Sequence, residues 1–269
     1  MRLGALAFIP AIPSIWNNPP HQLSRGDLTN PKVANHPAAR TPWLSHPNPE
    51  PCDKIPFLGA KSAQESKDPC DMDRIMSTLR KPTEVEMRSL MLAKARAYKK
   101  LNEMTNRLNQ REPRALARAK LFFGADVCID GLITGLNLIK RTISMVSHDK
   151  SFVVDPIKDD CNIVAFVFLP QSAGIDVGFQ GIFMRQNFFE APRYAQGTTM
   201  IHEAAHLALR VEDVVLPDGF GAYGENRAIY LAVTQPEQAI HNADNWAKFV
   251  DSWPSREVEK YVDIIMNGK

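Results

Sequence analysis

The residues with the clearest chemistry in this sequence are His202, Glu203 and His206, which form the pattern His-Glu-x-x-His. In an α-helix, residues four apart lie on one face, so both imidazoles can bind one metal ion. Glu203 is turned by about 100° from His202 and can reach a water molecule beside that metal. Imidazole nitrogens are common Zn²⁺ ligands, and a catalytic zinc keeps one position open for water. The pattern therefore predicts hydrolysis by metal-activated water, with Glu203 as general base.

The residues that flank this pattern favour a helix buried on most of its surface. Seven apolar residues surround the polar ones, namely Met200, Ile201, Ala204, Ala205, Leu207, Ala208 and Leu209. A structural helix that carries these three polar residues by coincidence is the alternative. The metal site is favoured, because a charged glutamate in such a helix needs a partner. The helix should end near Leu209 or Arg210, since β-branched residues, Pro217 and three glycines follow.

A catalytic zinc needs a third protein ligand, and three carboxylates are candidates. Position six after His206 is Glu212 and not histidine, which excludes the pattern with a third histidine there. Asp213 and Asp218 lie in the loop that must fold back beneath the metal. Glu225 follows His206 by nineteen residues and opens a predicted helix, a spacing typical of a two-histidine, one-glutamate site. An early end of the metal helix favours Asp213, with the other two as alternatives.

Two long amphipathic helices should precede the metal helix. The first begins at about Thr83, and its apolar residues recur three and four positions apart: Met87, Leu90, Ala93, Ala97, Leu101, Met104 and Leu108. Pro113 falls beyond its end, and a linker that contains Phe122-Phe123-Gly124 is predicted to follow. The second helix runs from about Val127 to Val146 and should pack on the first.

Strands are predicted for the apolar segments at 152–154, 163–169 and 181–184. The second segment is apolar throughout and should be buried. Beside them, Asp155, Asp159 and Asp160 form an acidic turn, which we interpret as solvated.

The part of the chain after the metal helix should begin as an irregular, glycine-rich stretch over 213–224. Two helices should follow, one around Ala228 and one around Trp246, and the tail from Val258 to Ile265 is also predicted to be helical. Helices, then a small sheet, then the metal helix is the order of an α+β protein.

Residues 1–69 contain twelve of the twenty prolines. Such a stretch is not expected to sustain a helix or a strand ladder, because proline lacks the backbone N–H. We therefore predict a poorly ordered, extended Pro-rich arm over 1–69 and a catalytic domain over 70–269. The arm is interpreted as a plain linker, with a pro-segment or a targeting or docking arm as the alternative.

The overall composition is that of an ordinary globular protein, with 44% hydrophobic and 23% charged residues in a chain of 269. The net charge of +2 argues against an extended surface for nucleic acid or anionic membranes. No run approaches about eighteen consecutive apolar residues, so no membrane-spanning helix is predicted.

The cysteines and the start of the chain bear on localisation. Cys52, Cys70, Cys128 and Cys161 have no C-x-x-C spacing, which leaves a structural zinc without support. They suit two disulfides in an exported protein or reduced, buried thiols. The apolar start of the chain partly resembles a signal peptide, although two prolines interrupt it. The expectation is a secreted or exported protein.

Several motifs together resemble the aspzincin family, which contains the deuterolysin and peptidyl-lysine metalloendopeptidases. They are the run Gly-Thr-Thr-Met-Ile-His-Glu-Ala-Ala-His, the acidic loop after it, Tyr223-Gly224, and Asn242-Ala-Asp-Asn-Trp246. The resemblance covers roughly residues 70 to 252. It implies a zincin-like metalloprotease domain, mainly helical with a small sheet, that follows the Pro-rich arm.

The resemblance also implies roles for single residues. His202 and His206 match the paired zinc ligands, Glu203 the general base, and Tyr223 a phenol that stabilises the oxyanion. The family's third ligand is the aspartate of a Gly-Thr-x-x-Asp loop, which points to Asp213.

This sequence departs from the family's loop. Leu209, Arg210 and Val211 include neither the Gly nor the Thr of that loop, and nine residues instead of three lie between Asp213 and Tyr223. Asp218 therefore stays an alternative, and the insertion over 216–222 is a candidate lid or specificity loop.

The motif Asn242-Ala-Asp-Asn-Trp246 has a simpler interpretation as the start of a helix. Asp244 or Asn245 would cap that helix and Trp246 would pack in the core. A contact between this motif and a metal ligand is the alternative.

The function predicted from these residues is a zinc endopeptidase that binds one Zn²⁺ per chain and acts on proteins or peptides. The resemblance adds a preference for basic residues next to the cleaved bond. The alternative is a zincin-fold binding or structural protein that lost turnover through its altered loop and acts through its Pro-rich arm.

Overall fold

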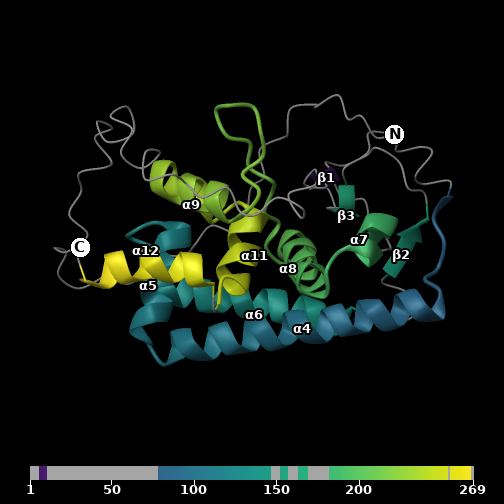
Figure 1. Ribbon diagram of the computed structural model, residues 1–269, viewed down its shortest axis with the longest axis horizontal. Coiled ribbons are helices and arrows are strands. Elements are labelled where there is room, and N and C mark those ends of the chain that lie inside the picture. The colour runs from purple at the N-terminus through teal and green to yellow at the C-terminus, as the bar shows by residue number, and fades with distance from the viewer. Residues whose placement is uncertain are drawn as a thin grey trace.

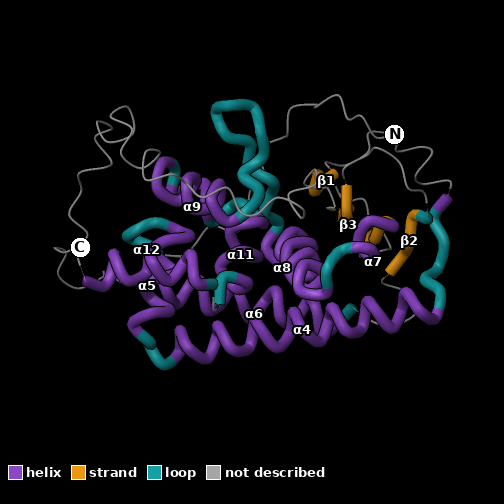
Figure 2. Tube along the Cα trace, viewed as in Figure 1, coloured by secondary structure: helices purple, strands orange, loops and turns teal. Residues whose placement is uncertain are grey.

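The computed structural model describes residues 6–10, 78–146, 152–156, 163–168, 182–253 and 255–267. Within them the protein is mainly helical, with a small sheet at one end (Figures 1 and 2). The long helix α4 runs along one edge of the molecule, and the other helices lie on one side of it in Figure 1. This arrangement confirms the mainly helical α+β class predicted from the sequence.

Helix α4 spans Glu84–Asn109 and begins where the sequence predicts. Thr83 is its N-cap, and Thr83 and Glu86 form a capping box in which each side chain binds the other's backbone N–H. The predicted apolar stripe is buried, apart from Met87, which is partly exposed. This face of α4 packs on α6 and α8.

The predicted linker after Pro113 is wrong, because residues Pro113–Phe123 form helix α5. Pro113 lies in the first turn of α5, where its missing N–H has no intrahelical partner to lose. Gly124 ends the helix with φ 93°, and a Cβ there would lie 2.6 Å from Cβ of Pro236. Phe122 and Phe123 therefore belong to a buried helix end and not to a loop.

Helix α6 spans Ile129–Met145 and packs on α4 and α8, as predicted for the second long helix. It begins two residues later than expected, because Cys128 is its N-cap and accepts a hydrogen bond from Gly131 N. Gly135 lies at a close approach to α11: an added Cβ would lie 2.4 Å from Cη2 of Trp246. This glycine lets the two helices meet.

The sheet has the strand order β1-β3-β4-β2. The three predicted strands are β2 (Phe152–Asp155), β3 (Ile163–Phe168) and β4 (Ile182–Arg185). β4 pairs antiparallel with β3 and parallel with β2, so the sheet is mixed. Among the described side chains of β3, Ala165 and Val167 are buried.

One prediction about the sheet region is wrong. Asp155 is fully buried, whereas the acidic turn was expected to be solvated. Its Oδ2 accepts a hydrogen bond from Nε of Arg185 at 2.9 Å, and its Oδ1 accepts one from Thr78. This pairing allows burial of the charge. Asp159 and Asp160 lie outside the described residues.

The first strand, β1 (Leu6–Pro10), comes from the Pro-rich arm and pairs antiparallel with β3. No ladder was expected in the arm, but these five residues precede most of its prolines. The register shifts between Phe8 and Pro10, as expected where proline cannot donate. The rest of the arm, and with it the proposed domain boundary at residue 69, lies outside the described residues.

The C-terminal half is helical, as predicted, with two additional short helices. Its elements are α7 (Gln186–Glu190), α8 (Arg193–Leu209), α9 (Glu225–Thr234), α10 (Pro236–Ala239), α11 (Ala243–Asp251) and α12 (Arg256–Asn267). α7 and α10 were not predicted, because helices this short carry too little apolar periodicity. α8 packs on α4, α6, α11 and β3 and lies at the centre of the fold. None of the helices in the described ranges is long and apolar enough to cross a membrane.

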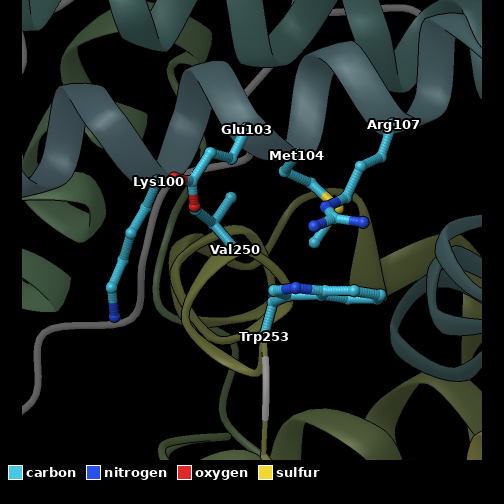
Figure 3. Close-up of a pocket in the computed structure, with 6 residues that line it drawn as sticks. All are labelled: Lys100, Glu103, Met104, Arg107, Val250 and Trp253. Atoms are coloured by element: carbon cyan, nitrogen blue, oxygen red, sulfur yellow. The ribbon is translucent and has the colours of Figure 1, made fainter.

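A small surface pocket lies between α4 and the end of α11 (Figure 3). Its lining residues are Lys100, Glu103, Met104, Arg107, Val250 and Trp253. The Arg107 guanidinium stacks over the Trp253 ring with its carbon 4.0 Å from the ring centroid. Arg118 contributes a second stacked guanidinium at 4.5 Å. These contacts join helices, and the pocket shares no residue with the site described next.

Candidate metal centre

The centre of the site is the last part of helix α8, where His202, Glu203 and His206 are all buried. The helical spacing brings the two imidazoles together, with their Nε2 atoms 2.9 Å apart. Helix α8 is held on several sides by other elements, so these polar groups lie in a rigid setting.

The chain turns sharply at the end of α8 and returns toward the two imidazoles. The helix ends at Leu209, as predicted, and Arg210 adopts a left-handed conformation with φ 54° and ψ 36°. The carbonyl of Val211 then accepts a hydrogen bond from Nδ1 of His206 at 2.7 Å. This turn places Asp213 Oδ1 3.1 Å from Nε2 of His202 and 3.5 Å from Nε2 of His206.

The three side chains fit a metal ion in number, chemistry and spacing. His202, His206 and Asp213 form a group whose ligand atoms lie within 4.8 Å of one another. A tetrahedral zinc with bonds of about 2.0–2.2 Å would hold its ligand atoms roughly 3.3–3.6 Å apart. Both carboxylate oxygens of Asp213 are buried and make no hydrogen bond of good geometry in the protein. A buried carboxylate in that condition calls for a cation.

Glu203 is fully buried beside the two histidines. Both of its carboxylate oxygens are buried without a hydrogen-bond partner. Without a cation beside it, burial raises the pKa of Glu203 to about 7, against the opposing effect of the two histidines. Burial lowers the pKa of His202, but neighbouring carboxylates, Asp213 above all, outweigh burial and raise that pKa to about 10. The cluster is therefore strongly coupled electrostatically.

Tyr223 lies beside His202, on the segment that leads into α9. Its ring stacks on the ring of His202 with centroids 6.1 Å apart. Burial, and then the charge of Asp213, raises the pKa of Tyr223 well above its usual value, so the phenol keeps its proton. Gly221 makes room for the ring, because a Cβ there would lie 2.3 Å from Cε2 of Tyr223.

The two alternative third ligands are not in the metal-binding group. Asp218 lies at the tip of the loop, half exposed, and binds Arg227 with both oxygens at 2.7 and 2.9 Å. Glu225 opens helix α9, as predicted, and does not join the two histidines in the group found among the described residues. The geometry therefore favours Asp213.

Asp244 contacts a metal-ligand candidate, and its predicted role as a helix cap is wrong. Asn242 occupies the N-cap position of α11 without a capping side-chain bond, and Asp244 lies inside the first turn. Its Oδ1 lies 3.3 Å from Nδ1 of His202, and its Oδ2 accepts a hydrogen bond from Gly224 N at 2.6 Å. A proton on Nδ1 facing Asp244 leaves Nε2 of His202 free for a metal.

Asn245 is not a cap either, since its amide binds the carbonyls of Phe122 and Ala228. The core position of Trp246 is confirmed, because the residue is fully buried. Sequence reasoning missed two contributions to the site, the carbonyl of Val211 and the absent side chain of Gly221. The glycine-rich composition of 213–224 was the available signal for the second, but it indicated only an irregular loop.

Two histidines on one helix, an aspartate from the loop after it and a buried glutamate beside them define the class of metal-dependent peptidases. Residues 137–251 match the aspzincin family profile, described as "Lysine-specific metallo-endopeptidase". Over these residues the chain is similar to that family of metallo-endopeptidases, and His202, His206 and Asp213 form its candidate metal site.

The structure is similar to that of a zinc peptidase from Grifola frondosa, with a TM-score of 0.46 and 22% sequence identity over 65% of this chain and 99% of that chain. No curated protein matches the sequence significantly.

Proposed function

We propose that His202, His206 and Asp213 bind one Zn²⁺ per chain and that Glu203 and Tyr223 act in peptide-bond hydrolysis at that site. The observation that carries the proposal is the convergence of three ligand atoms beside a buried, unpaired glutamate. When bound, zinc supplies Lewis acidity toward the scissile carbonyl and acidifies a water molecule. Binding of substrate proteins or peptides follows from the family.

The protein's own residues would then handle the proton and the developing charge. Glu203 takes a proton from the attacking water and delivers it to the leaving amine. Tyr223 keeps its proton and donates a hydrogen bond to the oxygen of the scissile carbonyl as negative charge develops there. Asp244 and the Val211 carbonyl hold the two imidazoles in the tautomer that leaves both Nε2 atoms free.

We further propose a preference for lysine or another basic residue next to the cleaved bond. The description of the family supports this preference. The site is also rich in carboxylates. The negative charges of Glu203 and Asp213 would balance the two positive charges of a zinc ion, and Glu212 and Asp244 would remain as additional acidic groups. Their field would attract a cationic substrate side chain.

An exported location is proposed on the basis of one disulfide. Cys128 is disulfide-bonded. Disulfides persist in oxidising compartments and are rare where thiols are kept reduced.

Replacement of Glu203 by glutamine tests the proposed function. The variant should lose peptide hydrolysis by about 10²–10⁴-fold, because it removes a proton acceptor and not a metal ligand. Zinc content, measured by mass spectrometry on the native protein, should stay at the parental value. The same change at the exposed Glu237 of α10 is the matched control and should leave both quantities unchanged. Hydrolysis at the parental rate in Glu203→Gln would contradict the mechanism.

A further inference from the structure

The loop between Asp213 and Tyr223 is an ordered hairpin. Val215 and Gly221 form an antiparallel bridge, and Leu216 N donates to Phe220 O at 2.8 Å. At its base, Ala222 N donates to Val214 O at 2.7 Å. We call residues 214–222 the hairpin, and Val214 and Ala222 its neck. The hairpin is the light-green loop that rises between α8 and α9 in Figure 1.

One buried side chain, that of Asn242, forms hydrogen bonds with both residues of the neck. Its Oδ1 accepts a hydrogen bond from Val214 N at 3.0 Å, and its Nδ2 donates to Ala222 O at 3.2 Å. The second Nδ2 proton binds Oδ1 of Asn245 at 2.7 Å. A flipped amide would place its NH₂ group against the N–H of Val214, which is also a donor, and its oxygen against the carbonyl of Ala222, which is also an acceptor. Only the observed orientation is therefore compatible with both partners.

The neck residues are the immediate neighbours of the two site residues that the hairpin joins. Val214 follows Asp213, and Ala222 precedes Tyr223. We propose that Asn242 is a positioning residue, which sets where the metal-ligand candidate Asp213 and the phenol of Tyr223 lie relative to each other. This inference rests on the proposed roles of those two residues.

Asn242 can do this because it is itself anchored to the helical core. Asn245, its partner, donates to Phe122 O at the end of α5 and to Ala228 O in α9. The backbone on either side of Asn242 is also fixed, since Glu212 N binds His241 O and Ala243 N binds Glu212 O, both at 2.9 Å. Asn242 and Asn245 are both fully buried. The chain of bonds therefore runs from three helices to the neck.

This arrangement explains how an insertion can be tolerated between two site residues. The added residues lie above the neck, where Arg227 binds Asp218 and the carbonyl of Gly221. Below the neck, the positions of Asp213 and Tyr223 depend on Asn242 and not on the length of the hairpin. An error of about 1 Å in such positions can reduce turnover about 100-fold.

Two variants distinguish the hydrogen bond of Asn242 to Val214 from its hydrogen bond to Ala222. Asn242→Ala removes every bond, so zinc affinity should fall about 10–100-fold, as for other residues that orient metal ligands. In the metal-free protein, amide hydrogen exchange at Val214 should accelerate at least about tenfold. Asn242→Asp keeps the acceptor for Val214 but loses the donor for Ala222. Its zinc affinity should stay within about threefold of the parent, while kcat at saturating zinc falls about 10–100-fold.

Thr105→Val is the matched control for the loss of a buried hydrogen bond, because Thr105 is buried in α4 and its hydroxyl binds Leu101 O. It should lower the melting temperature without changing zinc affinity or kcat. A double-mutant cycle adds a test of mechanism: the loss in kcat from Asn242→Asp should shrink to less than about threefold in a Tyr223→Phe background.

The outcomes distinguish this inference from the proposed function. Parental zinc affinity and parental exchange at Val214 in Asn242→Ala would overturn the positioning role. If Tyr223→Phe is silent in the parent, the proposed role of the phenol fails, but zinc affinity and exchange still decide the role of Asn242. If Asn242→Asp does not fold because of its buried carboxylate, zinc affinity and exchange in the alanine variant alone decide whether Asn242 is a positioning residue.

Discussion

At the scale of single residues, the main result is the position of Asp213. The left-handed turn at Arg210 brings the carboxylate of Asp213 3.1 Å from Nε2 of His202, although the family's Gly-Thr pair is absent before Asp213 in this chain. Arginine can adopt this conformation at a modest cost in free energy, whereas glycine adopts it freely. The altered loop therefore still delivers an aspartate to the two histidines, and the structure gives no support to a binding protein that has lost its site.

Three alanine substitutions test the choice of third ligand. Asp213→Ala should lose zinc, because two histidines alone hold the ion weakly. Asp218→Ala removes the ion pair with Arg227, and Glu225→Ala removes a charge at the start of α9 that acts on Arg118. Neither carboxylate is in the metal-binding group, so both variants should bind zinc like the parent. Competition with a chromophoric chelator measures the affinities. Loss of zinc in Glu225→Ala, with Asp213→Ala unaffected, would reverse the assignment.

At the scale of elements, the first turn of α11 organises the site although it contributes no metal ligand candidate. Asp244 orients His202, and Asn242 binds both sides of the hairpin neck. This turn can reach the site because α11 packs on α8, and the indole of Trp246 reaches from α11 to Gly135 of α6. The contact with α6 depends on Gly135, whose missing side chain leaves space for the indole of Trp246.

Gly135→Ala should therefore destabilise the protein. At an exposed position inside a helix, the same change would stabilise the folded protein by about 1 kcal/mol. The added Cβ would overlap the Trp246 ring, and overpacking of this kind costs about 1–3 kcal/mol. Urea unfolding measures the difference. In a Trp246→Phe background the loss should be smaller, because the smaller ring lacks the atoms that clash. A more stable Gly135→Ala variant would show that the two helices are not in contact at this point.

At the scale of the whole molecule, the residues just before α4 join the helices to the sheet. The backbone of Arg80 exchanges two hydrogen bonds with Val154 in β2, at 3.0 and 2.8 Å. Its guanidinium binds both oxygens of Glu86 in α4 at 2.7 Å. The Arg80 guanidinium lowers the pKa of Glu86 to about 2, against the opposing effect of burial. The ion pair is thus a pH-sensitive link between the helices and the sheet.

The stability of the protein should depend on this link in a defined pH range. The folded pKa of Glu86 is about 2 and its ordinary value is 4.5, so the ion pair contributes fully above pH 4.5 and is lost as the pH falls toward 2. Glu86→Gln keeps the capping box and removes the charge. Its free energy of unfolding should be lower by about 1 kcal/mol at pH 7, where water screens the pair in part.

The difference between Glu86→Gln and the parent should vanish between pH 4.5 and 2, as measured by chemical unfolding at each pH. Glu84→Gln is the control in the same turn, because its pair with Arg88 is largely exposed. A difference that is equal at all pH values would mean that the charge of Glu86 has no part in stability.

The sequence by itself determined the helices with strong periodicity, the strands and the placement of His202, Glu203 and His206 together on one helix. These features depend on residues that are neighbours within one element, so local spacing is sufficient to find them. Local spacing was insufficient to predict α5, because a proline such as Pro113 can mark the end of one helix as well as the beginning of the next.

Only the tertiary structure decided the contacts between distant segments. Asp213 was favoured from the sequence, but two other carboxylates were also compatible with a loop of unknown path. The burial of Asp155 against Arg185 and the contacts of Asp244 with His202 could not be predicted, because each joins residues at least thirty positions apart. Loop closure and helix packing set those distances, and no local pattern encodes them.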